Sequence, residues 1–140
     1  MSNHEILAVL AEYQAAVAAG DAGRAMATVA ERPVVFDLAP PLVQHSGVTE
    51  LAAWIASFTV PPVLTHHDPV VHADGDVAFV HALTSMTGDK GGTFTLWFRS
   101  TIGLRRTAGR WFVVHQHESV PFHMDGSFRA AVDLAPEVVV

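Results

Sequence analysis

The chain has 140 residues, half of them hydrophobic and only 16% charged, with a formal net charge of −6, which excludes a disordered chain and suits one domain, 1–140. The few basic residues form no patch beyond Arg105, Arg106 and Arg110 near one turn, so we expect neither nucleic acid nor a membrane surface as a partner. The absence of cysteine excludes disulfides, and no apolar run reaches the roughly 20 residues of a membrane helix, so we expect a cytoplasmic protein.

Two helices are expected at the N-terminus. Apolar residues at helical spacing between residues 6 and 17 predict a first helix to about residue 19, which Gly20 ends. Asp21 can cap a second, shorter helix that runs to Val29, and Pro33 closes it. A short strand over 34–37 follows.

A third helix is predicted to begin at residues 47–50 and to end before Pro61. Its apolar side chains form a single stripe, made of Leu51, Trp54, Ile55 and Phe58. From there the pattern is β, with four strands at roughly 63–73, 76–87, 93–106 and 110–120, separated by glycine-containing turns. In the tail, residues 127–134 could form a helical turn.

This order of elements predicts an α+β fold. A sheet this long for its chain must curl, and the helices with apolar stripes must fill its concave side. We therefore expect a cone-shaped, curved mixed sheet wrapped around N-terminal helices, closed at one end and open at the other.

The last strand carries an alternating pattern that divides its side chains between the two faces of the sheet. The odd positions are Trp111, Val113, His115, His117 and Ser119, and the even positions are Phe112, Val114, Gln116, Glu118 and Val120. The odd side begins apolar and turns polar, as in a strand that packs a core and then lines a cavity. We expect this side to face a hollow inside the cone.

At this point the chain resembles the SnoaL-like family of the nuclear transport factor 2-like superfamily, which has a cystatin-like cone fold. That superfamily includes ketosteroid isomerases, polyketide cyclases, limonene epoxide hydrolases and the association domain of calcium/calmodulin-dependent kinase. The resemblance covers nearly the whole chain. The segments that carry it are Tyr13 through Gly20-Asp21, His45-Ser46-Gly47, Leu96-Trp97-Phe98-Arg99-Ser100-Thr101 and Gly109 through Pro121.

The resemblance implies roles for Tyr13 and Asp37. In ketosteroid isomerases a tyrosine of the first helix donates to the substrate oxygen, and an aspartate at the end of the first strand moves the proton; these match Tyr13 and Asp37. Those enzymes add a second acid on a later strand, but residues 93–107 contain no Asp or Glu. Alternatively, Tyr13 is a core aromatic and Asp37 a turn carboxylate.

His115 and His117 are further catalytic candidates, because imidazoles titrate near neutral pH and these two share one strand face. The alternative is a buried histidine that ties strands together. We expect no metal, since the two lack an obvious third ligand, and no cofactor. His66, His67 and His72 are expected to form a solvated face.

Six further residues are candidates for ligand binding. Arg99 either neutralises an internal acid, binds an acidic ligand, or lies exposed at a dimer interface. Aromatic side chains would supply apolar walls for a hydrophobic, cyclic ligand. The full set is Trp54, Phe58, Phe79, Trp97, Arg99 and Ser119.

Two functions follow from these observations. The first is a cofactor-free isomerase, cyclase, dehydratase or hydrolase that transfers protons on a small hydrophobic molecule. The second is a ligand-binding or dimerisation module without turnover. In both cases we expect a homodimer that forms through the convex face of the sheet.

Overall fold

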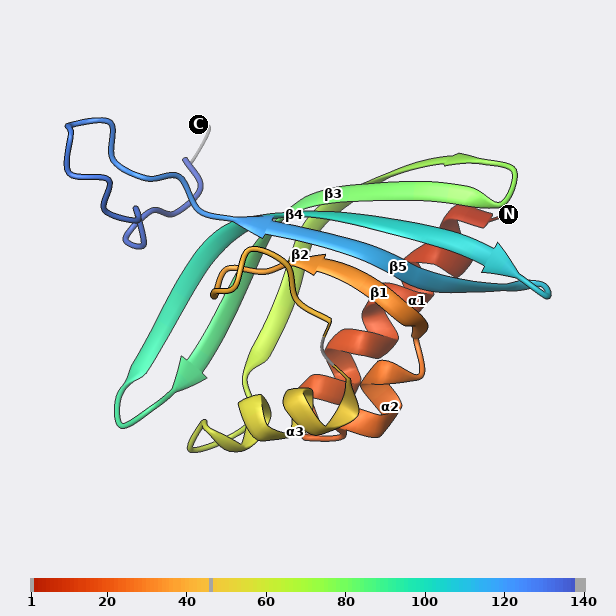
Figure 1. Ribbon diagram of the computed structural model, residues 1–140, viewed down its shortest axis with the longest axis horizontal. Coiled ribbons are helices and arrows are strands. Elements are labelled where there is room, and N and C mark those ends of the chain that lie inside the picture. The colour runs from red at the N-terminus through yellow and green to blue at the C-terminus, as the bar shows by residue number, and fades with distance from the viewer. Residues whose placement is uncertain (1, 46, 138–140) are drawn as a thin grey trace.

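The computed structural model describes residues 2–45 and 47–137, and Ser46 at the start of the third helix lies outside them. Three helices and five strands form one α+β unit, as the sequence predicts (Figure 1). Its elements are α1 (Ser2–Ala18), α2 (Ala22–Met26), β1 (Val29–Phe36), α3 (Val48–Ala56), β2 (Val63–Asp74), β3 (Val77–Asp89), β4 (Thr93–Thr107) and β5 (Arg110–Ser119). None of the helices described is both long enough and apolar enough to cross a membrane.

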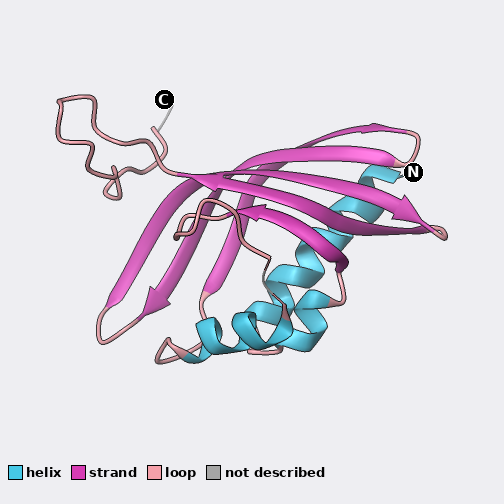
Figure 2. Ribbon diagram, in the orientation of Figure 1, coloured by secondary structure: helices cyan, strands magenta, loops and turns pink. Residues whose placement is uncertain are grey.

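The five strands form one mixed sheet in the order β1-β5-β4-β3-β2. The four strands from β2 to β5 are a meander of antiparallel neighbours, and β1 pairs with β5 in parallel. The sheet curves around α1, and all three helices lie on the same side of it (Figure 2). We call the helix side the concave face and the opposite side the convex face.

Apolar burial between the sheet and the helices produces two core clusters. The first joins Ile6 and Leu10 of α1 to strand residues such as Ile102, Leu104 and Val113, all at most 3% exposed. The second joins Ala16 and Val17 of α1 to side chains of α2 and α3. Because these residues define the concave face, their cross-strand partners reveal which other side chains point inward.

The region between α2 and β1 differs from its prediction. The helix ends at Met26 and the strand begins at Val29, so Pro33 does not close a helix but lies buried inside β1. An edge strand tolerates proline because one side of its backbone has no strand to pair with. The ladder between β1 and β5 shifts register between Val29 and Val34, on either side of this proline.

The tail also differs from its prediction. Residues 127–134 form no helical turn; a β-bridge joins Phe122 to Ala130 instead, and the rings of Phe122 and Phe128 lie 5.4 Å apart. The segment after β5 extends beyond the end of the sheet, as the blue trace shows (Figure 1).

A single irregularity in β5 determines which of its residues face inward. Leu104 pairs with Val113, but Gly103 pairs with His115, so Val114 is an extra residue in the strand. Such a β-bulge reverses the alternation beyond it. Trp111 and Val113 therefore lie in the concave core. Beyond the bulge the even-numbered residues point inward: Gln116 lies opposite Ile102, and Glu118 lies opposite Ser100.

Candidate functional site

Two carboxyl groups meet at the concave rim, where β1 and β5 run in parallel. Phe36 at the end of β1 pairs with His117, which places Asp37 and Glu118 next to each other one residue further along. A side-chain hydrogen bond joins the two carboxyls. Burial, the negative charge of Asp37 and this hydrogen bond together raise the pKa of Glu118 to about 8, and burial makes the largest contribution. Glu118 is therefore protonated at neutral pH.

Tyr13 of α1 packs against the second core cluster and is close enough to the same pair for their charges to act on its hydroxyl. Burial raises the pKa of its hydroxyl, and the charges of Glu118 and Asp37 add to the effect, so the phenol stays neutral. Among the residues that the structure describes, no side chain or backbone group forms a hydrogen bond with the Tyr13 hydroxyl. Tyr13 thus offers an unused O–H donor close to the two acids.

Asp37 itself lies at the solvent edge of the site. It is exposed, and its Oδ1 accepts a hydrogen bond of 2.7 Å from the backbone N–H of Leu38. Together with Glu118 it lines a pocket of about 680 Å³, whose other walls are Phe36, His117 and the loop from Leu38 to Val43. A small molecule in this pocket can reach both carboxyls.

A row of polar side chains continues across the concave face away from Glu118. Ser100 on β4 is the cross-strand partner of Glu118, and its Oγ lies 2.8 Å from the Oγ1 of Thr84 on β3. The Nδ1 of His66 on β2 lies 2.8 Å from the same Thr84 oxygen. Ser100 and Thr84 are 2% and 1% exposed, so the row is buried in the sheet interior.

His66 occupies the end of this row in a desolvated environment. Burial lowers its pKa to about 4, with a smaller contribution from the neighbouring His67. Its backbone N–H donates to the Oε1 of Gln14 on α1 over 3.4 Å. The expectation that His66 belongs to a solvated face is therefore wrong, although His67 and His72 do lie on the convex face.

The expected inward direction of His115 and His117 is also wrong, because the bulge at Val114 turns both to the convex face. His117 pairs with the exposed Thr101, and both imidazoles contact the ring of Phe36, at centroid distances of 4.9 Å and 5.3 Å. The Nδ1 of His115 lies 2.6 Å from the carbonyl oxygen of Val34, as in a histidine that ties two strands together.

Four of the candidate ligand-binding residues share this convex face. Arg99 is exposed and its Nε donates to the Ser119 Oγ over 3.2 Å, and no acid among the described residues forms an ion pair with it. Trp97 contacts the ring of His67 at 4.4 Å, and Phe79 stacks on His72 at 4.5 Å. Trp97 and Arg99 line a second pocket of about 660 Å³, which is separate from the carboxyl pair.

The remaining two candidates, Trp54 and Phe58, are on the concave side as expected. Trp54 packs against the second core cluster, and its ring meets that of the buried Phe58 edge to face at 5.1 Å. Phe58 lies just past the end of α3 and also stacks against Phe94 of β4. Both are aromatic core on the helix side of the sheet.

Sequence reasoning named Tyr13 and Asp37, whose roles stay predictions, and it did not single out Glu118 or the inward position of His66. The signal that could have revealed Glu118 is the pair of consecutive valines, Val113 and Val114, which interrupts strict alternation in β5. No comparable signal marks His66, since its neighbour His67 gives the same residue type on the opposite face.

The arrangement suits acid–base chemistry. It combines a carboxyl that holds its proton at neutral pH, an exposed carboxylate and a neutral phenol within one group of neighbours. Within the described residues, no group of three or more His, Asp or Glu side chains is arranged to hold a metal ion.

Comparisons with known proteins agree with this fold. The sequence profile of the SnoaL-like domain matches residues 6–123. A crystal structure of a nuclear transport factor 2-like protein of unknown function from Pseudomonas putida KT2440 has 30% identity, covers 97% of this chain and 99% of its own, and has a TM-score of 0.83. None of the curated proteins matches the chain.

Two more distant structures share the fold. A candidate dehydratase of the nuclear transport factor 2-like family from Streptomyces avermitilis has 17% identity and a TM-score of 0.73, with 83% of this chain and 93% of that chain covered. A candidate association domain of calcium/calmodulin-dependent protein kinase II from Xanthomonas campestris has 21% identity and a TM-score of 0.69, with 82% and 84% covered.

Proposed function

The chain belongs to the SnoaL-like domain family, and on that premise we propose that it is a cofactor-free enzyme that transfers protons on a small hydrophobic molecule. The reaction classes that fit are isomerisation, cyclisation, dehydration and hydrolysis of a cyclic substrate. The observation that carries this proposal is the pair of Glu118, protonated at neutral pH, and the neighbouring Asp37.

Asp37, Tyr13 and Glu118 have different roles in the proposed reaction. Asp37, at the pocket, is the base that removes a proton from a carbon next to a carbonyl group. The electron pair released moves to the carbonyl oxygen, where the O–H groups of Tyr13 and Glu118 stabilise the enolate. Return of the proton from Asp37 to another carbon completes an isomerisation, with no atom gained or lost.

Dehydration needs only one change in this scheme. After Asp37 removes the proton, the protonated Glu118 donates its own proton to a departing hydroxyl group, which leaves as water. Two of the similar structures are described as candidate dehydratases, at 17% and 14% identity, which gives this reaction some support.

The test is proton exchange from bound ketones. A thermal-shift screen of small cyclic ketones identifies ligands, since binding to the native state raises the melting temperature. Deuterium exchange at the carbon next to the carbonyl is then followed by NMR in D₂O. Asp37→Asn should abolish enzyme-dependent exchange, whereas the exposed Asp133→Asn should leave it unchanged.

Glu118→Gln supplies an independent arm, because glutamine keeps the size but holds no transferable proton. It should slow exchange strongly, while the exposed Glu31→Gln should have no effect. Unchanged exchange in Asp37→Asn would end the assignment of Asp37 as the base.

A non-catalytic binding or dimerisation module is the second candidate, and the convex face supplies a surface on which such a module could associate. Its β2–β3 side carries half-exposed apolar side chains, Val70, Phe79 and Leu83 at 44–47% exposure, and the helices lie on the opposite side of the sheet (Figure 2). We propose that a second copy of the chain covers this face in a homodimer. This association is compatible with either function at the concave rim.

A further inference from the structure

The segment that follows β5 is an arm with an apolar surface. We call residues 121–134 the arm; it extends beyond the end of the sheet, as the blue trace shows (Figure 1). Its large apolar side chains remain outside the core of their own chain. Those that are 47–88% exposed are Phe122, Met124, Phe128, Val132 and Leu134. Such a group on one short segment indicates a contact with another surface.

The arm has a defined conformation that holds these side chains outward. The backbone N–H of His123 donates to the carbonyl oxygen of Arg129 over 2.8 Å, across the two sides of the arm. At its tip, the Oδ1 of Asp125 accepts from the backbone N–H of Ser127 over 2.9 Å. The exposure of the apolar side chains is therefore a property of a folded turn.

The convex face carries a pocket whose walls suit such side chains. This convex pocket, of about 660 Å³, is lined by Val70 on β2, Leu83 on β3 and Trp97 on β4. Its volume falls in the range of about 300–1,000 Å³ that is usual for binding pockets, so it has room for apolar side chains. Pro136, two residues past the arm, also lines it, so the arm adjoins the convex side of the sheet.

The charges on the arm and at the pocket complement each other. Arg99 lines the convex pocket, and no acid in the described part of the chain forms an ion pair with it. The arm carries exposed Asp125 and Asp133 against a single cation, Arg129. Asp68 also lines the pocket and offsets part of its positive charge. Arg99 would therefore orient an incoming arm more than it would strengthen the contact.

A second copy of the chain satisfies both surfaces at once. We propose that Met124 and Phe128 of one copy insert into the convex pocket of the other, with Asp125 beside Arg99 of the partner subunit. A two-fold axis makes the exchange reciprocal, because each copy gives an arm and receives one, and the result is a closed dimer. This rests on the homodimer proposed above and names the contact that holds it together.

Sedimentation of the full chain over a concentration series tests the arm. Phe128→Asn removes the ring, and asparagine tolerates the positive φ of 56° at this position. Combined with Met124→Ser, it should raise the dissociation constant of the dimer about tenfold or more, since burial of one such side chain can supply that factor. Val60→Ser, at an exposed apolar position after α3, is the control and should change nothing. An unchanged constant in the double variant would overturn the proposal.

Cross-linking locates the arm, and the lack of cysteine in the chain makes the reaction specific. A Met124→Cys chain and a Leu83→Cys chain are co-expressed with different tags, purified through both tags and treated with a short bismaleimide. Each chain then has one thiol, so every link joins two chains. Mass spectrometry should find the arm peptide joined to the pocket peptide, whereas Val60→Cys in place of Leu83→Cys should give no link. A dimer without the arm–pocket link would contradict the proposed contact.

The outcomes separate this contact from the proposals on which it rests. A dimer that Leu83→Arg dissociates but that the arm variants leave intact would keep the homodimer and contradict the role of the arm alone. A wild type that is monomeric at high concentration would overturn both and would assign the arm to a different partner. Ketone exchange is measured independently, so the enzymatic proposal is tested by itself.

Discussion

Glu118 and Asp37 lie side by side on parallel neighbouring strands, and a hydrogen bond joins a protonated carboxyl to a carboxylate. The two acids differ because Glu118 is partly buried, which disfavours its charged form, and Asp37 is exposed. Two adjacent carboxyls in different environments are a recurring means of separating an acid from a base in one site. This relationship makes several consequences measurable.

The first prediction concerns stability against pH. The folded state holds the Glu118 proton up to a pKa of about 8, whereas the unfolded chain releases it near 4.5, so stability falls as pH rises through this window. Each pKa unit corresponds to about 1.4 kcal/mol. The side chain in Glu118→Gln resembles the protonated acid. The variant should therefore unfold at about the same temperature as the wild type at pH 5, and at a higher temperature than the wild type at pH 9.

Calorimetry at both pH values measures this difference, with Glu31→Gln as the control for replacement of an exposed glutamate. A Glu118→Gln protein that gains nothing at pH 9 would show that the carboxyl is not desolvated in the folded state.

The second prediction concerns Gly88, in the β3 strand beneath α3. A Cβ at this position would lie 2.7 Å from the Phe58 ring and 2.8 Å from the Phe94 ring, closer than real contacts allow. Gly88→Ala should therefore lower the free energy of unfolding by about 1–3 kcal/mol through overpacking. Urea denaturation measures it. Gly92→Ala is the control, since nothing lies within 4 Å of a Cβ there.

The third prediction concerns association through the convex face. Leu83→Arg places a charge at the centre of its apolar side chains and should convert a dimer to a monomer, as measured by light scattering. Val60→Arg, at a similarly exposed position in the loop after α3, should not change the mass. A wild type that is monomeric at high concentration, or an unchanged mass in Leu83→Arg, would contradict the proposed homodimer.

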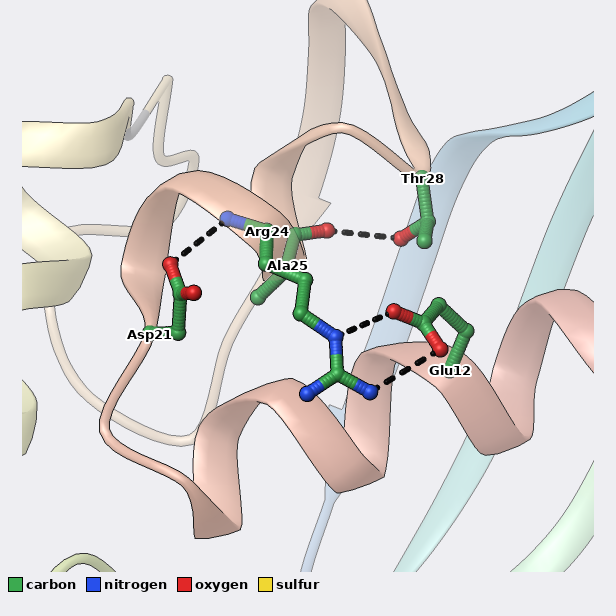
Figure 3. Close-up of polar contacts among 5 residues, drawn as sticks. All are labelled: Glu12, Asp21, Arg24, Ala25 and Thr28. Carbon is green, nitrogen blue, oxygen red and sulfur yellow. Dashed lines mark hydrogen bonds and ion pairs between the residues drawn. The ribbon is translucent and has the colours of Figure 1, made fainter.

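The fourth prediction compares two polar contacts at the start of α2, shown in Figure 3. The Asp21 carboxylate accepts from the backbone N–H of Arg24 over 3.0 Å as an N-cap, and the Arg24 side chain forms an exposed ion pair with Glu12. Asp21→Ala should lower the free energy of unfolding by about 1 kcal/mol. Arg24→Gln should cost less than Asp21→Ala, because solvent screens the exposed pair.

Thermal unfolding at low and high salt distinguishes the two variants. The wild type and Asp21→Ala retain the ion pair, which salt screens, so their melting temperatures should fall slightly at high salt. Arg24→Gln lacks the pair and should not show this fall. A larger loss in Arg24→Gln than in Asp21→Ala would reverse this ranking.

The sequence predicted the architecture well because periodicity reports which residues are buried. The apolar spacing of α1 and the glycine turns between β2, β3, β4 and β5 are local signals, and the structure confirms these elements. The α2–β1 boundary was wrong because Pro33 is compatible with two local structures, a helix end and an edge strand. Only the pairing of β1 with β5 decides between them.

The site was harder to predict than the fold. Tyr13 and Asp37 were proposed through a family resemblance, and their roles remain predictions, whereas the inward position of Glu118 depends on the register of β5 against β4. Register is a property of two strands at once, and the alternation of one strand cannot locate a bulge with certainty. The same limit placed His115 and His117 on the wrong face.

The extra residue in β5 decides which chemistry lines the concave face. If Val114 paired with Gly103 instead of bulging, every later residue of the strand would move on by one position, and imidazoles rather than carboxyls would point at the helices in its second half. Loss of the bulge alone would thus exchange the chemistry lining the concave face without altering any functional side chain. Redesign of the interior can therefore act on strand register as well as on residue identity.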